Sequence, residues 1–464
     1  MDLTVREFLS IKHCSFGFHG NPGILDEAVS GISIDSRKVS AGEIFFAIRG
    51  ETHDGHDFIG AAFENNAQAA VVCKSWWTNC PAHLESNNFF VVEDTLAALQ
   101  EAAHFYRGKF TLPVLALTGT NGKTTTKEMV ATVLGQKHTV CKTRGNLNNH
   151  IGLPLSLFAL DQQQEVAILE MGCNHFGEIA RLCEIAEPQF GLITNVGHGH
   201  LEFFADLEGV AKAKAELFEN LHPPGTAFIN LDDPLISKYV PANLKSVTYG
   251  FKEEARVSGE VSGADEHGCF AFRVEKTPIR LNVPGKHNLS NALAAVAVGL
   301  EFGVSLSKIK QALENVALPG QRMEMFERNK VRIINDSYNA NPDSTRASLS
   351  VLKQTQSTGK KIFVFADMLE LGERATLEHA EIGKALKDYR VDVVLAFGEY
   401  AEAAVAAARK ASKKIVAKHF SEKTALVKAL KEQIKAGDVL LVKGSRGMKM
   451  EEVLQKLFAE SKMP

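Results

Sequence analysis

The sequence predicts an α/β protein of three domains, of which the central one is a doubly wound and mostly parallel sheet. Three observations predict this fold. The chain has 464 residues, whereas a single domain averages roughly 150. Short apolar runs alternate with helical segments along most of the chain, which is typical of βαβ units. A glycine-rich loop stands between one of these runs and a helix start. We expect domains at residues 1–109, 110–318 and 319–464.

The apolar runs give the predicted strands in chain order. In the first domain they are residues 44–48 and 69–73, with helical stretches between them. The second domain has strands at residues 114–117, 166–169, 190–194 and 226–231, then a β-rich insertion at 246–283 and a helix at 288–302. The segment Leu318-Pro319-Gly320 is predicted to be a hinge. The third domain repeats the α/β rhythm with strands at residues 331–334, 361–365, 391–397 and 439–442.

The composition excludes several kinds of partner. The 52 basic and 55 acidic residues leave a net charge of −3, so the sequence indicates neither a nucleic acid nor a membrane surface. The seven cysteines include no C-x-x-C pair and no metal-ligand spacing, which is typical of a reduced cytoplasmic protein. The N-terminus lacks the pattern of a signal peptide. No segment approaches the ~20 apolar residues of a membrane-spanning helix.

The glycine-rich loop is Gly119-Thr120-Asn121-Gly122-Lys123-Thr124-Thr125. It follows a buried strand and opens a predicted helix at residues 124–134, so its backbone N–H groups and the helix dipole form an anion site. Lys123 would reach the terminal phosphates of a nucleotide, and the Thr124 hydroxyl would bind Mg²⁺. The spacing is shorter than a standard Walker loop, whose first glycine would fall at Leu117. The alternative is a glycine turn that happens to carry a lysine. We predict an ATP site.

Three further segments carry candidate site residues. Glu170 ends the strand at 166–169, where a carboxylate suits Mg²⁺, although a helix cap or a surface position is the alternative. His198 and His200 follow the strand at 190–194, and spacing alone does not separate a ligand from a hydrogen-bonding histidine. Lys214 lies on the apolar stripe of a predicted helix at 207–221, whereas Lys212 lies on its polar face. Lys214 either extends outward to solvent or is recruited or modified at the site.

The central segments together resemble the Mur ligases, the ATP-dependent amide-forming enzymes of peptidoglycan precursor synthesis. The shortened loop matches the family's own version. The resemblance implies that Thr124, Glu170 and His200 hold Mg²⁺, with two ions expected, and that Lys214 is carbamylated into an anionic oxygen ligand. It places Asn288 and Asn291, in Gly285-Lys286-His287-Asn288-Leu289-Ser290-Asn291, near the nucleotide.

The outer segments extend this resemblance to nearly the whole chain. Asp35-Ser36-Arg37-Lys38-Val39 resembles a UDP-binding N-terminal domain, with Ser36 and Arg37 as substrate contacts. Pro319-Gly320-Gln321-Arg322-Met323-Glu324 resembles the family's hinge with one extra residue before Arg322, the implied phosphate contact. In Asn335-Asp336-Ser337-Tyr338-Asn339-Ala340-Asn341-Pro342, Asp336 would lie by the nucleotide, and Asn339 and Asn341 by the incoming amine. The third domain is expected to be Rossmann-like.

The resemblance implies a reaction. ATP would convert the terminal carboxylate of UDP-N-acetylmuramoyl-tripeptide to an acyl phosphate, which D-alanyl-D-alanine then attacks. Lys123, His200, Lys214 and Arg322 would be the catalytic residues. The alternative is the family member that adds the third amino acid to UDP-N-acetylmuramoyl-dipeptide. The sequence identifies neither a general base for the amine nor whether the tripeptide ends in lysine or diaminopimelate. A monomer is expected from the family.

Overall fold

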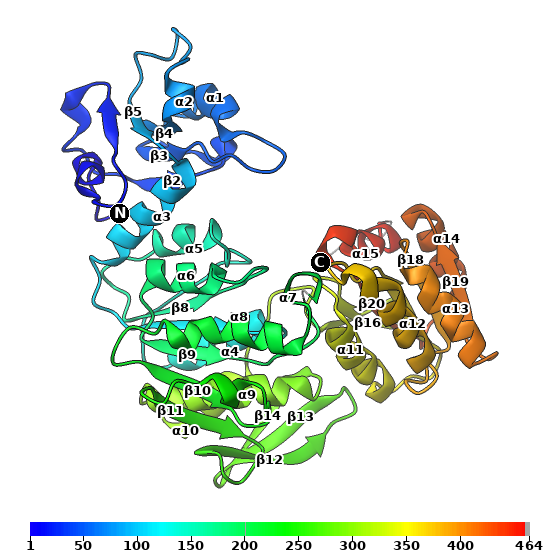
Figure 1. The fold of residues 1–464 in the computed structure, drawn as a ribbon. Helices are drawn as coiled ribbons and strands as arrows, with labels where there is room; N and C mark the ends of the chain where they lie inside the picture. The colour runs from blue at the N-terminus through cyan, green and yellow to red at the C-terminus, as the bar shows by residue number, and fades with distance from the viewer. Residues whose placement is uncertain (200, 460–464) are drawn as a thin grey trace. The chain divides into compact units, whose positions relative to one another are not determined.

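The computed structural model describes residues 1–199 and 201–459 of the chain (Figure 1). It divides into two compact units. The first contains Met1–Leu117, His138–Leu192 and Glu216–Thr226, and the second contains Thr118–Lys137, Ile193–Ala215 and the chain from Ala227 onward. The limits of the three predicted domains are not tested by this division and stay predictions.

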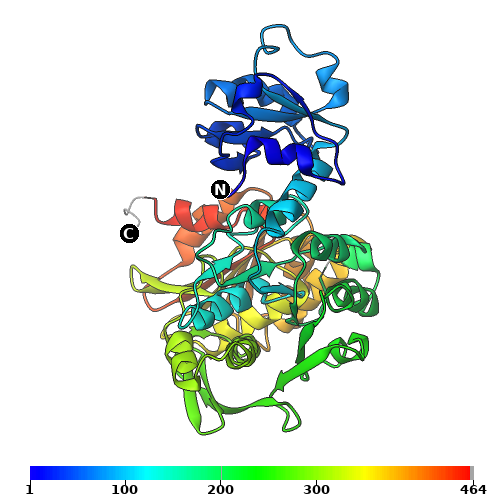
Figure 2. The ribbon, with the colours of Figure 1, turned by 90° about the vertical axis from the view of Figure 1, so that its left-hand side faces the viewer.

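The N-terminal section, blue in Figures 1 and 2, forms a five-stranded sheet in the order β1-β5-β4-β3-β2. Its strands are parallel except for the β1–β5 pair. The predicted strand at 69–73 is β4. The one predicted at 44–48 is β3, which begins one residue earlier and ends two residues earlier than predicted. The elements are β1 (Gly17–His19), β2 (Gly31–Ser33), β3 (Glu43–Phe46), α1 (Ile59–Glu64), β4 (Ala69–Cys73), α2 (Lys74–Trp77), β5 (Phe89–Val92) and α3 (Thr95–Arg107).

The central elements belong to a sheet with the strand order β14-β13-β12-β11-β10-β9-β6-β8-β7 in the described residues. The strands β6, β8 and β7 pair in parallel, whereas β12, β13 and β14 form the predicted β-rich insertion with antiparallel pairs. The elements are β6 (Val114–Thr118), α4 (Lys123–Leu134), β7 (Val140–Lys142), α5 (Gly152–Leu157), β8 (Val166–Glu170), α6 (Glu178–Ala186), β9 (Phe190–Ile193), α7 (Leu201–Phe204), α8 (Leu207–Glu219), β10 (Thr226–Asn230), β11 (Lys245–Gly250), β12 (Val257–Ala264), β13 (Cys269–Val274), β14 (Thr277–Pro284), α9 (His287–Glu301) and α10 (Leu306–Glu314).

The C-terminal section forms a six-stranded sheet in the order β15-β16-β20-β17-β18-β19, parallel except for β15. The elements are β15 (Glu324–Arg328), β16 (Val331–Asp336), α11 (Pro342–Gln354), β17 (Lys361–Ala366), α12 (Ala375–Ala385), β18 (Val393–Phe397), α13 (Ala401–Ala411), β19 (Val416–Phe420), α14 (Lys423–Gln433), β20 (Val439–Lys443) and α15 (Glu451–Leu457).

Both faces of this C-terminal sheet are buried, which explains its continuous apolar strands. Along β17, Phe363 and Phe365 pack into one core with residues of α11, α12 and α13. Ile362 and Val364 point to the opposite face and pack with residues of α14 and α15. Strand residues alternate between faces, so a strand covered by helices on both sides needs apolar residues at every position. This section therefore has helices on both faces of a mostly parallel sheet, in agreement with the Rossmann-like third domain that the sequence predicts.

Candidate functional site

The phosphate loop, residues 119–125, begins directly after β6 as predicted, and its last three residues form the start of α4, one residue earlier than predicted. Gly119 has φ +145° and Gly122 has φ +78°, and Gly122 is the N-cap of α4. A Cβ at position 119 would lie 1.9 Å from the Thr194 hydroxyl oxygen, and one at 122 would lie 2.6 Å from Asn291 Oδ1. Both glycines are therefore required by backbone conformation and by space.

The Lys123 ammonium lies against this loop. Its Nζ donates to the carbonyl of Gly119 at 2.7 Å and to that of Thr120 at 3.3 Å. Thr124 follows in the first turn of α4 and is buried. The structure thus brings together the cation, the hydroxyl and the backbone N–H groups of a helix start, which is the chemistry of a phosphate site.

Asn288 and Asn291 lie on α9, which packs against α4 behind the phosphate loop. Asn291 Oδ1 accepts a hydrogen bond from the Thr126 hydroxyl at 3.2 Å, and its Nδ2 donates to Asn288 Oδ1 at 2.9 Å. Asn288 Nδ2 donates to the carbonyl of Pro284 at 2.7 Å. Both asparagines are buried, so the contacts seen here hold α9 to the loop helix. A contact with nucleotide stays a prediction.

Glu170 is the last residue of β8 and pairs in register with Leu117, two residues before the phosphate loop begins. Its side chain is 2% exposed, and Oε1 accepts from Asn148 Nδ2 at 2.8 Å. Its backbone N–H donates to the Thr143 hydroxyl at 2.9 Å. The alternative of a surface or capping glutamate is excluded, because the carboxylate is buried at a strand end.

Lys214 lies on α8 and is 2% exposed, whereas Lys212 is exposed. The apolar stripe therefore predicted the buried face of this helix correctly, and the ammonium does not extend outward to solvent.

His198 hydrogen-bonds to Asp343 through its backbone N–H at 2.7 Å, and His200 lies outside the described residues. Within the described part of the chain, no group of three or more histidine, cysteine, aspartate or glutamate side chains is arranged to hold a metal ion.

Asp336 is the last residue of β16 and Asn339 lies three residues later, and both contact Lys443 at the end of β20. Lys443 Nζ donates to Asp336 Oδ2 at 2.5 Å and to the Asn339 carbonyl at 2.9 Å. Asp336 also accepts from the backbone N–H of Met323 at 3.1 Å and from the Ser348 hydroxyl at 2.6 Å. These contacts hold the carboxyl ends of two neighbouring strands together. Sequence reasoning assigned Lys443 no role in the site, although an apolar strand that ends in a lysine could have indicated one.

Arg322 lies two residues after the predicted hinge, Leu318-Pro319-Gly320. Its guanidinium stacks on the Tyr338 ring, 3.9 Å from the ring centroid. It also lines a cavity of about 410 Å³ together with Pro284, Pro319 and Glu324, a size typical of small-molecule sites. The role of Arg322 as a phosphate contact stays a prediction.

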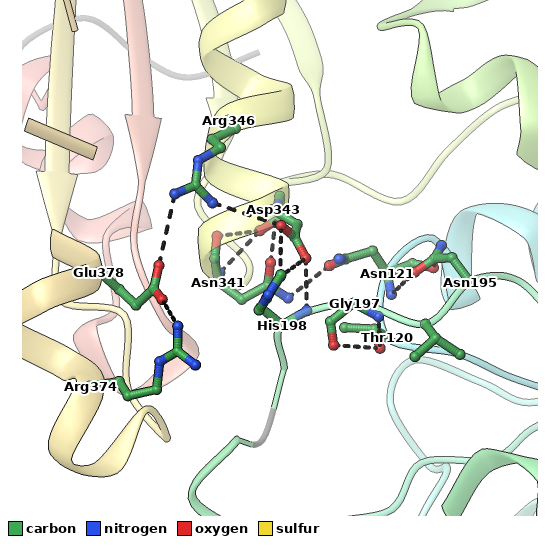
Figure 3. A network of polar contacts seen from close by, with 12 residues as sticks. Thr120, Asn121, Asn195, Gly197, His198, Asn341, Asp343, Arg346, Arg374 and Glu378 are labelled. Carbon is green, nitrogen blue, oxygen red and sulfur yellow. Dashed lines mark hydrogen bonds and ion pairs between the residues drawn. The ribbon is translucent and has the colours of Figure 1, made fainter. Parts of the chain in front are cut away.

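Asn341 is the N-cap of α11, and its side chain reaches the phosphate loop (Figure 3). Its Oδ1 accepts from the Ser344 backbone N–H at 2.8 Å, and its Nδ2 donates to Asn121 Oδ1 at 2.8 Å. Asp343, two residues later, accepts from the His198 N–H. The structure thus places Asn341 beside the loop predicted to bind ATP, and it adds Asp343, which sequence reasoning missed.

Ser36 and Arg37 lie in a short 3₁₀ helix that Asp35 caps. The Asp35 carboxylate accepts from Arg37 Nε at 2.8 Å and from its backbone N–H at 3.2 Å. The Arg37 guanidinium lowers the pKa of the Asp35 carboxyl to about 2. Ser36 is buried, and its carbonyl accepts from Asn65. A contact of either residue with a UDP substrate stays a prediction.

No helix in the described part of the chain is long and apolar enough to cross a bilayer.

Comparison with known proteins covers nearly the whole chain. Three family models match: the Mur ligase family catalytic domain at residues 28–107, the Mur ligase middle domain at 117–299, and the Mur ligase glutamate ligase domain at 321–446. A relative from Bacillus subtilis, named UDP-N-acetylmuramoyl-tripeptide--D-alanyl-D-alanine ligase, is 36% identical over 97% of this chain and 98% of its own length. A relative of the same name from Escherichia coli is 36% identical over 93% of this chain and 94% of its own length.

Solved structures of Mur ligases have the same fold as this chain. MurF from Acinetobacter baumannii superposes with a TM-score of 0.87 and 30% identity, covering 98% of each chain. MurF ligase from Thermotoga maritima in complex with ADP superposes with a TM-score of 0.81 and 31% identity, covering 93% of this chain and 98% of that one. The predicted three-domain α/β fold class is confirmed.

Proposed function

This chain belongs to the Mur ligase family, and we propose that it joins D-alanyl-D-alanine to UDP-N-acetylmuramoyl-tripeptide at the expense of ATP. The observation that carries this proposal is the full-length match to relatives of that name, with a phosphate loop of the family's own spacing. The alternative, addition of the third amino acid to UDP-N-acetylmuramoyl-dipeptide, is not favoured by these relatives.

The reaction proceeds in two steps. The terminal carboxylate of the tripeptide attacks the γ-phosphorus of ATP, so that ADP leaves and an acyl phosphate forms. The neutral amine of D-alanyl-D-alanine then attacks the acyl carbon. The carbon–oxygen bond to phosphate breaks as the amide forms, and the attacking nitrogen releases its proton to the departing phosphate or to water. Activation is needed because a carboxylate oxygen is a poor leaving group, whereas phosphate is a good one.

The first step brings a carboxylate to a polyanion, so the site must stabilise negative charge. The phosphate loop supplies backbone N–H groups and the Lys123 ammonium, which the loop carbonyls hold in place. Arg322 supplies a second cation from the hinge segment. The ATP requirement is supported by the relative solved with ADP.

Mg²⁺ suits the donors in this part of the chain. The buried Glu170 carboxylate and the buried Thr124 hydroxyl are hard oxygen ligands of the kind that Mg²⁺ prefers. We propose two Mg²⁺ ions in all, with His200 and Lys214 as further ligands of the second ion. A protonated lysine cannot bind a cation, so Lys214 fits this role only as its carbamate. When bound, Mg²⁺ would screen the phosphate oxygens and the developing charge.

The remaining residues are assigned to the two other substrates. We place the UDP moiety at Ser36 and Arg37 and the incoming dipeptide at Asn339 and Asn341, on the domains proposed as residues 1–109 and 319–464. Asn288, Asn291 and Asp336 complete the proposed ATP site. We also propose a cytoplasmic location, since the precursors are soluble nucleotides, and a monomer, as the family leads us to expect.

Phosphate release tests the proposal. Purified protein with ATP and UDP-N-acetylmuramoyl-tripeptide should release phosphate when D-alanyl-D-alanine is present and not when lysine or diaminopimelate replaces it. The same protein should not use the dipeptide nucleotide with free lysine or diaminopimelate. Turnover in that second assay alone would overturn the proposal in favour of third-residue addition.

A further inference from the structure

Asp343 lies in the first turn of α11 and contacts the loop that follows β9, residues 194–199 (Figure 3). We call this segment the β9 loop. The Asp343 Oδ2 atom accepts from the backbone N–H of His198 at 2.7 Å, and the His198 ring Nδ1 lies 3.2 Å from the same oxygen. One carboxylate therefore holds both the backbone and the side chain of one loop residue. Hydrogen bonds to an ionised acceptor are about twice as strong as neutral ones.

The β9 loop is packed closely between this carboxylate and the phosphate loop. A Cβ at Gly197 would lie 2.7 Å from Asp343 Oδ2, and one at Gly199 would lie 2.7 Å from Thr120 Cγ2. On the phosphate-loop side, the backbone N–H of Gly197 donates to the Thr120 hydroxyl at 3.0 Å. Neither glycine has a positive φ, so space and not backbone conformation requires them. A larger residue at either position would collide with Asp343 or with Thr120.

A parallel set of hydrogen bonds joins the same three segments through Asn121. Asn341 Nδ2 donates to Asn121 Oδ1, and the Asn121 backbone N–H donates to Asn195 Oδ1 at 3.0 Å. The Asn121 carbonyl accepts from the Thr194 hydroxyl at 2.7 Å and from Asn195 Nδ2 at 2.8 Å. The start of α11, the β9 loop and the phosphate loop thus form one polar network.

We propose that Asp343 is a positioning residue, whose carboxylate holds the β9 loop in register with the phosphate loop. The consequence for catalysis rests on the proposed function, because the β9 loop runs directly into the proposed Mg²⁺ ligand His200. Asp343 comes after the hinge, on the section proposed to bind the dipeptide. It therefore links the geometry of the ATP site to the section that carries the amine substrate.

The competing explanation is that Asp343 only stabilises α11, since an acidic residue in the first turn favours the helix dipole. The two explanations differ in what the side chain must supply. Positioning needs an acceptor atom aimed at the His198 N–H, whereas the dipole needs a negative charge. Asp343→Asn keeps an acceptor oxygen and removes the charge, and Asp343→Ala removes both.

The first test measures phosphate release as ATP and Mg²⁺ are varied separately. Asp343→Ala should raise the ATP and Mg²⁺ concentrations for half-maximal rate by on the order of tenfold or more, the scale of one lost bond to a charged group. Asp343→Asn should recover about half of that loss in free energy, because a neutral acceptor forms a hydrogen bond about half as strong. Arg346→Gln is the matched control, because Arg346 approaches Asp343 only to 3.8 Å, and its values should stay within about twofold. Equal losses in Asp343→Asn and Asp343→Ala would overturn the proposal.

A double-mutant cycle tests the contact itself. In Gly197→Ala the new methyl group would displace the Asp343 carboxylate from the His198 N–H, so this variant should show much of the Asp343→Ala defect. In the Asp343→Ala background that clash is absent, so adding Gly197→Ala should do little more. Strictly additive effects would show that the two positions act independently and would contradict the proposal.

Hydrogen exchange in the full chain without substrates separates this proposal from the proposed function. Asp343→Ala should speed exchange in the peptide that covers residues 195–199 by on the order of tenfold, and Asp343→Asn should speed it less. Unchanged exchange in Asp343→Ala would overturn the positioning role even if the enzyme turns over. A wild-type protein that does not release phosphate would refute the proposed function, whereas the exchange result would still decide the role of Asp343.

Discussion

Replacing Lys443 by methionine should lower the free energy of unfolding of the C-terminal sheet by about 3 kcal/mol. The Lys443 side chain is 2% exposed and donates to Asp336 and to the Asn339 carbonyl. Methionine keeps most of the volume but leaves the Asp336 carboxylate without its cation. Breaking a buried pair in this way costs about 3–5 kcal/mol. The lower end applies because Asp336 is 14% exposed and still accepts from Met323 and Ser348.

Native-state hydrogen exchange of the β16 and β20 amides is the assay. Tryptophan fluorescence would miss the change, since the two tryptophans are Trp76 and Trp77. A loss of about 3 kcal/mol corresponds to roughly hundredfold faster exchange in amides that open with the whole sheet. Lys384→Met is the control, because the Lys384–Glu381 pair is exposed and is worth about 0.5 kcal/mol or less.

The double variant Asp336→Asn with Lys443→Met completes the cycle. It should recover most of the lost stability, because no buried charge is then left uncompensated. Wild-type exchange rates for the β20 amides of Lys443→Met would refute the reasoning. So would a double variant as unstable as the single one, since the cost would then come from packing.

Three further changes have defined outcomes. Gly122→Ala should raise the ATP concentration for half-maximal rate at least tenfold, because the added Cβ would meet Asn291. Gly145→Ala is the control: Gly145 has φ +56° and its Cβ would meet no atom within 4 Å, so the change carries only a conformational cost of about 1–2 kcal/mol. It should leave the ATP concentration for half-maximal rate unchanged. With labelled CO₂, the wild-type protein should show a carbamate carbon signal in ¹³C NMR. Lys214→Arg should abolish both that signal and phosphate release. A fully active wild-type protein without the signal would exclude the carbamate. Burial raises the pKa of Asp54, but hydrogen bonds from His56 outweigh it and lower that pKa to about 2. The stability that Asp54 contributes is therefore complete above about pH 4 and is lost as the pH falls toward 2, because the unfolded state binds the proton first. Fluorescence of Trp76, whose ring lies 5.8 Å from that of His56, should report this transition, and Asp54→Asn should show less of it.

Local sequence was sufficient for the buried strands and for the phosphate loop. The strands β6, β8 and β10 are mostly apolar because every residue in them is buried, so their positions could be predicted to within a residue or two. The position of Lys214 on a buried face followed from helical periodicity in the same way. The edge strand β15 could not be found, because its residues are mostly half-exposed or exposed and form no apolar run.

The sequence alone therefore determined most of the buried strands, the position of the glycine-rich loop between a strand and a helix, and the family to which the chain belongs. Only the tertiary structure decided the partners of the polar residues. Asn341 bonds Asn121, 220 residues away, and Asp343 bonds His198, which spacing had left undecided. The physical reason is that periodicity and turn chemistry act over a few neighbouring residues and report burial. A hydrogen bond or ion pair between distant segments depends on how strand ends and helix starts are brought together by packing of the core.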